Sequence, residues 1–385
     1  MIRSESDFTL PASPRLPTGT LAGLFRNRTN SYKYLFFLSL LEKVESRSSD
    51  WPDSSVVSLS SLGAEMLVIA WYPHTLFKLS FGSTDQVAQV LEENPVELDS
   101  TRAASVCKQE VLRRHFRATD AASSLLRFVP QRLVRPFFAT ELRGVPDHRV
   151  DPMVVELSGE HFLSRKPLYH FTQDRGAIIL HPEWWAYLRD NLPIVRKWAL
   201  WEWLGYMQIR NPSTPNLLAK LVPSVDRSPL TRQREFWDIA IRHWPSKRGL
   251  HSVYSGTRLD PTSYQLDHFV PWAFVAHDRL WNLLPAEPAI NVEKSDRVPH
   301  PDYVHVAASL HATAIRAFNE ALTAGKIPRR KFEARAEEYM VDLHVGSTGE
   351  MLDRGVFVER YINHVRPLIE LAKANGFAGD WRAAV

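Results

Sequence analysis

The sequence predicts a mainly helical protein that carries a small mixed α/β insert in its C-terminal third. Most long segments repeat apolar residues at helical spacing, and short strand-like runs occur at only two places. The composition, 44% hydrophobic and 23% charged, is that of an ordinary globular protein. A chain of 385 residues exceeds the usual size of one core, so we expect more than one domain.

Residues 1–165 are predicted to form a helical N-terminal domain with a DNA-binding or regulatory role. After an extended lead-in, helices are expected over 31–46, from a cap at Asp53-Ser54-Ser55 to Trp71, after Thr84-Asp85, and over 100–117. Residues 119–165 are richer in proline and glycine, which predicts irregular structure there.

Residues 166–249 predict a hairpin followed by a Trp-rich helical connector. The hairpin is expected from 167–172 and 177–180, which flank Asp174-Arg175-Gly176. Five tryptophans fall within 182–209. Their helical spacing favours buried core aromatics over the alternative, a stacking platform for nucleic-acid bases. One more helix is predicted over 230–244.

Residues 250–345 are predicted to hold the chemistry, and residues 346–385 a C-terminal helix. Helices are expected over 304–324, 328–344 and 356–374. Pro328 suits a first helical turn, and Arg354-Gly355 provides a break before the last helix.

Three polar anchors, His268, Asn282 and Asn291, follow one another 14 and then 9 residues apart. Residues 263–268 predict a strand that ends in Asp267-His268, and Asn282-Leu283-Leu284 a second strand. Pro288 is placed to begin a helix that carries Asn291 and Lys294. The expected unit is strand, loop, strand and helix, with Asp267, His268 and Asn291 gathered at its mouth.

These residue types suit hydrolysis of a phosphodiester. His268 is a candidate general base, because a neutral imidazole can take a proton from water near neutral pH. Asp267 and Asn291 offer the oxygen ligands that Mg²⁺ prefers. Asn282 is expected to orient the His268 loop through backbone hydrogen bonds, and Lys294 to contact phosphate.

Residues 263–299 resemble the HNH (ββα-metal) endonuclease superfamily, in particular the HNH domain of RNA-guided CRISPR effectors and stand-alone bacterial HNH proteins. The resemblance implies that Asp267 and Asn291 bind Mg²⁺ or Mn²⁺, that His268 is the catalytic base, and that Asn282 is structural. It also implies products with 5′-phosphate and 3′-hydroxyl ends. The rest of the chain, residues 1–165 especially, resembles the N-terminal part of bacterial HNH proteins, some of which are found with anti-phage defence genes; the stretch from Trp71 to Gly82 carries this resemblance.

One departure from those relatives concerns zinc. Many carry Cys-x-x-Cys before the first strand, where this chain has Ser252-Val253-Tyr254-Ser255-Gly256. Cys107 is the only cysteine, and serine hydroxyls are poor zinc ligands. We therefore expect no structural zinc. The hairpin should instead be held by packing, with Trp272, Phe274 and Trp281 as anchors.

The charge distribution suggests where nucleic acid would bind. The net charge is +4, yet residues 101–150 hold ten Lys/Arg against four acids, whereas residues 251–300 hold four against six. Arg113, Arg114 and Arg117 are therefore candidate DNA contacts; the alternative is a solvated helix face. Among several histidines near the motif, His277 is the best candidate for a phosphate contact.

The sequence thus predicts a metal-dependent DNA endonuclease, expected to be a nickase or nuclease effector of bacterial anti-phage defence. The alternatives are an RNA-cleaving or restriction-type nuclease and a catalytically idle nucleic-acid-binding protein. Double-stranded DNA is the expected partner, with other defence proteins as further candidates. The longest apolar run, residues 34–41, is too short to span a bilayer, and no secretory signal is visible. A cytoplasmic location is expected.

Overall fold

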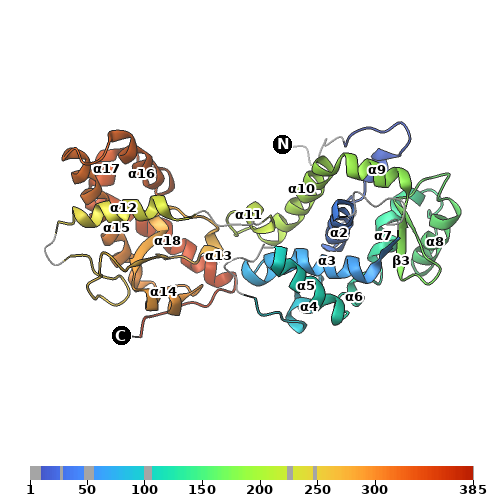
Figure 1. Cartoon of the computed structure of the whole chain (residues 1–385), viewed down its shortest axis with the longest axis horizontal. Coiled ribbons are helices and arrows are strands. Elements are labelled where there is room, and N and C mark those ends of the chain that lie inside the picture. Colours follow the sequence, from blue (N-terminus) through green and yellow to red (C-terminus); the bar gives the residue numbers. More distant parts are fainter. Residues whose placement is uncertain are drawn as a thin grey trace. The chain divides into compact units, whose positions relative to one another are not determined.

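A computed structural model describes residues 10–26, 29–46, 56–98, 106–222, 229–245 and 249–384 of the chain (Figure 1). The described residues are mainly helical and contain two small antiparallel sheets, which confirms the predicted fold class. Among them, none of the helices combines the length and apolarity needed to cross a lipid bilayer.

The chain divides into two compact units. The first comprises Met1–Pro212 and Leu217–Asp226, and the second Ser213–Asn216 and Arg227–Val385. The connector expected over residues 166–249 is therefore shared between the units.

The core of the first unit is built around helix α2 (Tyr32–Ser46), which packs against α3 (Leu59–Trp71) and α10 (Leu192–Arg210). Nearly every residue of α2 from position 34 to 44 is buried. A helix that is apolar on all sides must be enclosed, and each large side chain buried there contributes about 1.5–3 kcal/mol. The ring of Trp198 stacks on Phe25, with ring centroids 5.0 Å apart.

Local side-chain hydrogen bonds mark the start of some helices in this unit. Ser58 begins α3, because its side chain accepts a hydrogen bond from the Ser61 amide. Asp85 similarly accepts from Val87 N at 2.9 Å ahead of α4 (Val87–Glu93). The cap expected at Asp53-Ser54-Ser55 lies outside the described residues. Helix α1 spans Thr18–Ala22, α5 Val106–Ala118 and α11 Leu217–Leu221, and a π-helical turn, η1, spans Tyr72–Leu76.

The prediction that residues 119–165 are irregular is wrong. They form α6 (Ser123–Leu126), α7 (Val129–Val134), the 3₁₀ turn η3 (Arg135–Phe138) and α8 (Asp147–Glu160). Pro130 and Pro136 lie in the first turns of α7 and η3, and Pro146 caps α8. A missing amide proton costs nothing at a helix start, so these prolines begin helices instead of breaking them.

The predicted hairpin is present as β2 (Tyr169–Phe171) and β3 (Ala177–Leu180), and a third strand, β1 (Val56–Ser58), adds to it in the order β1-β3-β2. The Trp-rich stretch forms α9 (Pro182–Asp190) and α10. Its tryptophans are core residues, as predicted, except Trp201, which is 57% exposed; the buried ones are Trp184, Trp185, Trp198 and Trp203.

In the second unit, α12 (Thr231–Arg242), α15 (Asp302–Thr323) and α18 (Arg354–Ala374) pack together, with α16 (Arg329–Asp342) and α17 (Thr348–Leu352) beside them. Burial lowers the pKa of His311, on α15, to about 3, so this core histidine is neutral.

Two of these helices also form hydrogen bonds to the backbone of residues 281–283, at the start of the second strand of the small sheet. Trp237 donates its indole N–H to the Leu283 carbonyl at 3.1 Å, and Tyr361 donates its hydroxyl to the Trp281 carbonyl at 3.0 Å.

Candidate functional site

The predicted strand–loop–strand–helix unit is present in the second unit. Strand β4 (Gln265–His268) pairs antiparallel with β5 (Leu283–Ala286), and α14 (Pro288–Lys294) follows. The loop between the strands contains the short helix α13 (Trp272–Val275) and the 3₁₀ turn η4 (Leu280–Asn282). Asn282 therefore closes a turn immediately before the strand that it was predicted to begin.

Asn282 is fully buried and bonds the backbone on the far side of the loop. Its Oδ1 accepts from Val270 N at 2.8 Å, and its Nδ2 donates to Val270 O at 2.9 Å. Its own carbonyl accepts from Phe269 N at 2.8 Å. These three bonds fix the backbone that directly follows His268, since buried amide groups cannot exchange such partners for water.

His268 is the last residue of β4, and its imidazole Nε2 lies 2.8 Å from Oδ1 of Asp278. A carboxylate only accepts hydrogen bonds, so this contact places the ring proton on Nε2 and the basic lone pair on Nδ1. Asp278 was not among the site residues predicted from the sequence. Its position could have indicated this role, because it is the only acid between His268 and Asn282.

Asp267 is 3% exposed and holds a buried ion pair with Lys294, whose exposure is 0%. The Lys294 ammonium lies 3.2 Å and 3.1 Å from the two Asp267 oxygens and donates to the His268 carbonyl at 2.6 Å. The hydroxyl of Tyr254 also donates to Asp267. Burial, and then the Asp267 charge, raise the pKa of Tyr254 well above its ordinary value. Lys294, predicted to contact phosphate, is thus directed into the interior.

Asn291 lies one helical turn before Lys294 and contacts a different residue of β4. Its Nδ2 donates to Oε1 of Gln265 at 2.8 Å. Gln265 and Asp267 share one face of the strand because they are two residues apart. Helix α14 therefore meets β4 through two successive pairs, Gln265–Asn291 and Asp267–Lys294.

A cavity of about 660 Å³ opens beside Asn291. Gln265 and Leu266 of β4 line one part of it, and α12 lines another with Arg234, Glu235 and Asp238. The charges in this cavity are mixed, and Arg234 lies 4.5 Å from the centre of the Tyr264 ring. Asn291 is consequently reachable from solvent, whereas Asp267 is covered.

A cluster of hydroxyls stands at the segment before β4, where the sequence has serines in place of a Cys-x-x-Cys pair. Oγ of Ser252 donates to Glu287 at 2.7 Å, Oγ of Ser255 at 2.5 Å and Oγ1 of Thr257 at 2.6 Å. Glu287 directly precedes α14, so the cluster joins the segment before β4 to the start of the helix. We name Ser252, Ser255, Thr257 and Glu287 the hydroxyl staple.

The staple also changes the acidity of its carboxylate. Burial acts to raise the pKa of Glu287, but the hydrogen bonds from Ser255, Thr257 and Ser252 outweigh it, and the pKa is lowered. Hydrogen bonds to the ionised form favour that form. Glu287 is therefore a charged anchor at neutral pH.

The predicted apolar anchors differ in burial. Phe274 and Trp281 are each 1% exposed, and Trp272 is only half-buried. Trp281 also donates its indole N–H to Asp342 at 2.8 Å. Packing and the hydroxyl staple thus act together on this hairpin.

His277 lies in the same loop, against the Trp281 ring at a centroid distance of 5.3 Å. Burial lowers its pKa to about 4. His277 is neutral near pH 7, so a contact from it to phosphate would be a hydrogen bond without a full charge.

The three arginines proposed as DNA contacts lie on α5 of the first unit and differ in their partners. Arg113 donates to both oxygens of buried Glu65, at 2.7 Å and 2.9 Å, and this hydrogen bonding raises its pKa. Arg114 is 80% exposed and pairs with Glu110 at 3.2 Å. Arg117 donates to Oγ of Ser61 at 3.3 Å. Arg113 is thus engaged with the core, and Arg114 is directed toward solvent.

Asp267 offers carboxylate oxygens and Asn291 an amide oxygen, and hard divalent ions such as Mg²⁺ bind oxygen ligands of this kind. Both Asp267 oxygens already carry the Lys294 ammonium, with which a metal ion would compete. Among the described residues, no group of three or more His, Cys, Asp or Glu side chains is placed to hold a metal ion. Cys107 lies exposed on α5.

Comparison with known protein families matches one segment of the second unit. Residues 252–300 match a family model described as HNH endonuclease. No curated protein and no solved structure matches the chain. The matched segment begins at the hydroxyl staple, contains β4, β5 and α14, and ends six residues after Lys294.

Replacing Lys294 with Met is expected to lower the free energy of unfolding by about 3–5 kcal/mol, because it leaves the Asp267 charge buried without its partner. Urea denaturation measures the change. Lys326→Met, at an exposed position, is the matched control and should be neutral within about 0.5 kcal/mol. Equal stability of the two variants would contradict the buried pair.

Replacing Glu287 with Gln is expected to destabilise the protein by about 1.5–3 kcal/mol at pH 7, because it removes the charged acceptor of three hydroxyls. The Glu287 pKa is depressed in the folded state, so this stabilisation is present above pH 4.5 and is lost as the pH falls below that value. Melting curves at several pH values should show the two proteins converging in acid. A constant difference would exclude a contribution from the carboxylate charge.

Proposed function

Because residues 252–300 match a family model described as HNH endonuclease, we propose that this protein is a metal-dependent nuclease that hydrolyses DNA phosphodiester bonds. The observation that carries the proposal is the setting of His268. Its imidazole is held by Asp278, and the backbone after it is clamped by Asn282. A general base needs such fixed geometry, because proton transfer depends on short, aligned contacts.

His268 acts as the base that removes a proton from the attacking water, and Nδ1 is the nitrogen that accepts it. Asp278 accepts the hydrogen bond from Nε2–H throughout and stabilises the imidazolium that forms. Asp278 is thus a positioning residue that acts through His268, and Asn282 positions the same loop from the turn η4 that precedes β5.

The proposed metal is Mg²⁺ or Mn²⁺, held by Asp267 and Asn291. When bound, it supplies positive charge that offsets the charge developing on the phosphate. Lys294 neutralises Asp267, so a metal held by Asp267 would compete with this ammonium for the carboxylate oxygens. Asn291 is the more accessible of the two donors.

One such unit cleaves one strand at a time, so the expected product from a monomer is nicked DNA. A role in bacterial defence against phage is proposed on the resemblance of Trp71–Gly82 alone. Survival of cells that express the protein during phage infection, compared with cells that express His268→Ala, tests this role.

Supercoiled plasmid incubated with Mg²⁺ or Mn²⁺ is expected to become nicked, and His268→Ala is expected to slow nicking by about 10²–10⁴-fold because the base is lost. EDTA should abolish the reaction. Agarose gels over a time course measure both effects.

A single-stranded RNA of matched length serves as the second substrate. Faster cleavage of RNA than of DNA would reassign the substrate. Equal cleavage by the wild-type protein and His268→Ala would contradict the assigned base, and cleavage of neither substrate would contradict nuclease activity.

Replacing Asp278 with Ala is expected to lower kcat for nicking by about 10–100-fold, a smaller effect than loss of the base through which it acts. KM should change little, because Asp278 is not proposed to touch DNA. Asp278→Asn keeps an oxygen that can accept from Nε2–H but lacks the charge that stabilises the imidazolium, so it should recover only part of the rate. A rise in KM with unchanged kcat would mean that Asp278 contributes to binding and not to positioning.

A further inference from the structure

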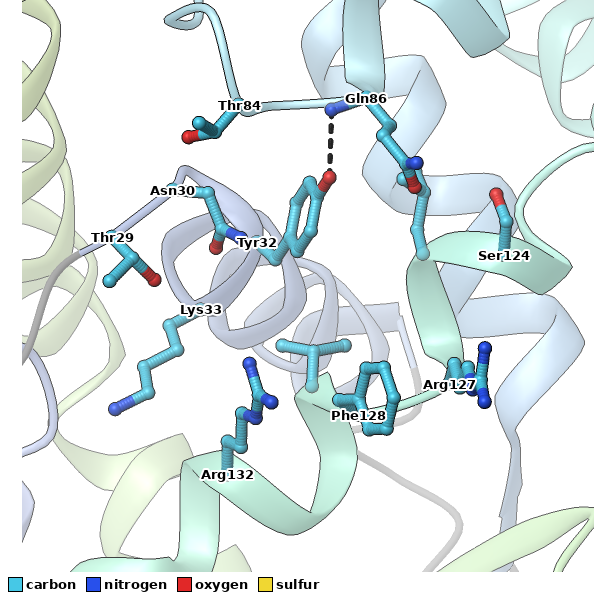
Figure 2. A pocket seen from close by; sticks show the side chains of 12 residues that line it. Thr29, Asn30, Tyr32, Lys33, Thr84, Gln86, Ser124, Arg127, Phe128 and Arg132 are labelled. Atoms are coloured by element: carbon cyan, nitrogen blue, oxygen red, sulfur yellow. Dashed lines mark hydrogen bonds between the residues drawn. The ribbon is translucent and has the colours of Figure 1, made fainter. Parts of the chain in front are cut away.

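The first unit contains a long groove that is separate from the nuclease motif. Two cavities, of about 490 Å³ and 800 Å³, share Thr29, Lys33 and Arg132 in their linings and therefore adjoin one another; we call the two together the groove. Figure 2 shows the smaller cavity, between the start of α2 and the turn from α6 to α7. Ligand sites have volumes of roughly 300–1,000 Å³, so each part is large enough for a ligand.

Positive charge dominates the lining of this groove. Among the described residues that line the two cavities, Asp147 is the only acid, against six cations: Arg26, Lys33, Arg127, Arg132, Arg135 and Arg143. Two of these arginines have a carboxylate partner only at the outer limit of an ion-pair distance. Arg135 lies 3.8 Å from Asp147, and Arg132 lies 3.9 Å from Asp151.

The Phe128 ring makes cation–π contacts with two of these arginines. The guanidinium carbon of Arg127 lies 4.8 Å from the Phe128 ring centre, and that of Arg132 lies 4.7 Å from it. The ring is 41% exposed and lies between the two guanidinium groups in Figure 2. Cation–π contacts use the face of a guanidinium and leave its N–H edge available, which is the edge that binds phosphate.

Lys33 brings a third cation close to these arginines. Its ammonium donates to the Leu24 carbonyl at 3.3 Å, a contact that supplies no negative charge. Burial, and then the charges of Arg135 and Arg132, lower its pKa. Like charges held together in a half-buried place repel one another, and a bound anion would relieve that repulsion.

Neutral hydrogen-bonding groups complete the smaller cavity. Thr29, Asn30, Gln86 and Ser124 line it, and Tyr32 accepts a hydrogen bond from Gln86 N at 2.7 Å. Amide and hydroxyl side chains are the groups that contact sugars and base edges in nucleic-acid complexes. Arginine forks match phosphate oxygens in pairs, and cations distributed over two cavities suit more than one phosphate.

We propose that this groove binds the phosphate groups of a nucleotide ligand, with Arg127 and Arg132 as the principal contacts and Phe128 as the residue that orients them. The ligand is either a strand of nucleic acid or a free nucleoside polyphosphate, and both present the same chemistry. The proposal does not depend on the nuclease assignment, because it concerns binding by the first unit.

The test uses the full-length His268→Ala protein in EDTA, so that cleavage cannot affect the result. Fluorescence anisotropy measures binding of a labelled single-stranded oligonucleotide, and calorimetry measures binding of ATP and of inorganic phosphate. The variant is Arg127→Gln with Arg132→Gln. The matched control is Arg189→Gln with Lys197→Gln, which removes the same charge from two first-unit residues that do not line the groove.

The groove variant is expected to bind the oligonucleotide at least tenfold more weakly than the control. Its salt dependence should also be less steep by about 1.4 in log Kobs against log salt, for two lost phosphate contacts on a single strand. Loss of ATP binding with unchanged oligonucleotide binding identifies a free nucleotide as the ligand. Unchanged binding of both, or binding of neither by the parent protein, overturns the proposal.

A shared loss of fold is excluded by equal melting temperatures of the groove variant and its control. If the double variant has a lower melting temperature, binding by a second variant, Phe128→Leu, is measured instead. This variant keeps every charge and removes only the aromatic ring. Weaker binding by Phe128→Leu then supports the proposal, and unchanged binding overturns the orienting role of the ring.

Discussion

The buried ion pair between Asp267 and Lys294 joins strand β4 to helix α14, and the geometry of the site depends on it. The same ammonium bonds the His268 carbonyl, so one side chain fixes both the carboxylate and the backbone of the candidate base. Two charges buried this completely are stable only while they remain paired. The pair therefore sets the position of the motif and also covers a residue that the motif assigns to metal binding.

The hydroxyl staple meets a second constraint, because a hairpin with one crossing helix has little core of its own. Ser252, Ser255 and Thr257 converge on Glu287 and so join the segment before β4 to the start of α14. A carboxylate that accepts several hydroxyls ties the same two segments without a metal. Such a tie depends on ionisation of Glu287 and weakens in acid, whereas a packed apolar anchor such as Trp281 does not.

The two units distribute charge differently. The nuclease motif lies in a segment with more acids than bases, and the first unit holds a groove lined mainly by cations. An excess of Arg and Lys along the chain is a weak guide to such a surface. Arg113 pairs with a buried glutamate, while Arg127 and Arg132 lie against the Phe128 ring in the lining of the groove.

The sequence by itself determined the helical class, the hairpin at 169–180 and the strand–loop–strand–helix order, because apolar periodicity and proline positions are local properties. It also placed Asn282 beside the loop that this residue bonds. Only the tertiary structure decided which side chains meet: Asp278 with His268, Glu287 with three hydroxyls, and Lys294 with Asp267. Those partners are 10 to 35 residues apart in the chain, and their meeting depends on how strands pair and helices cross, which residue spacing does not specify.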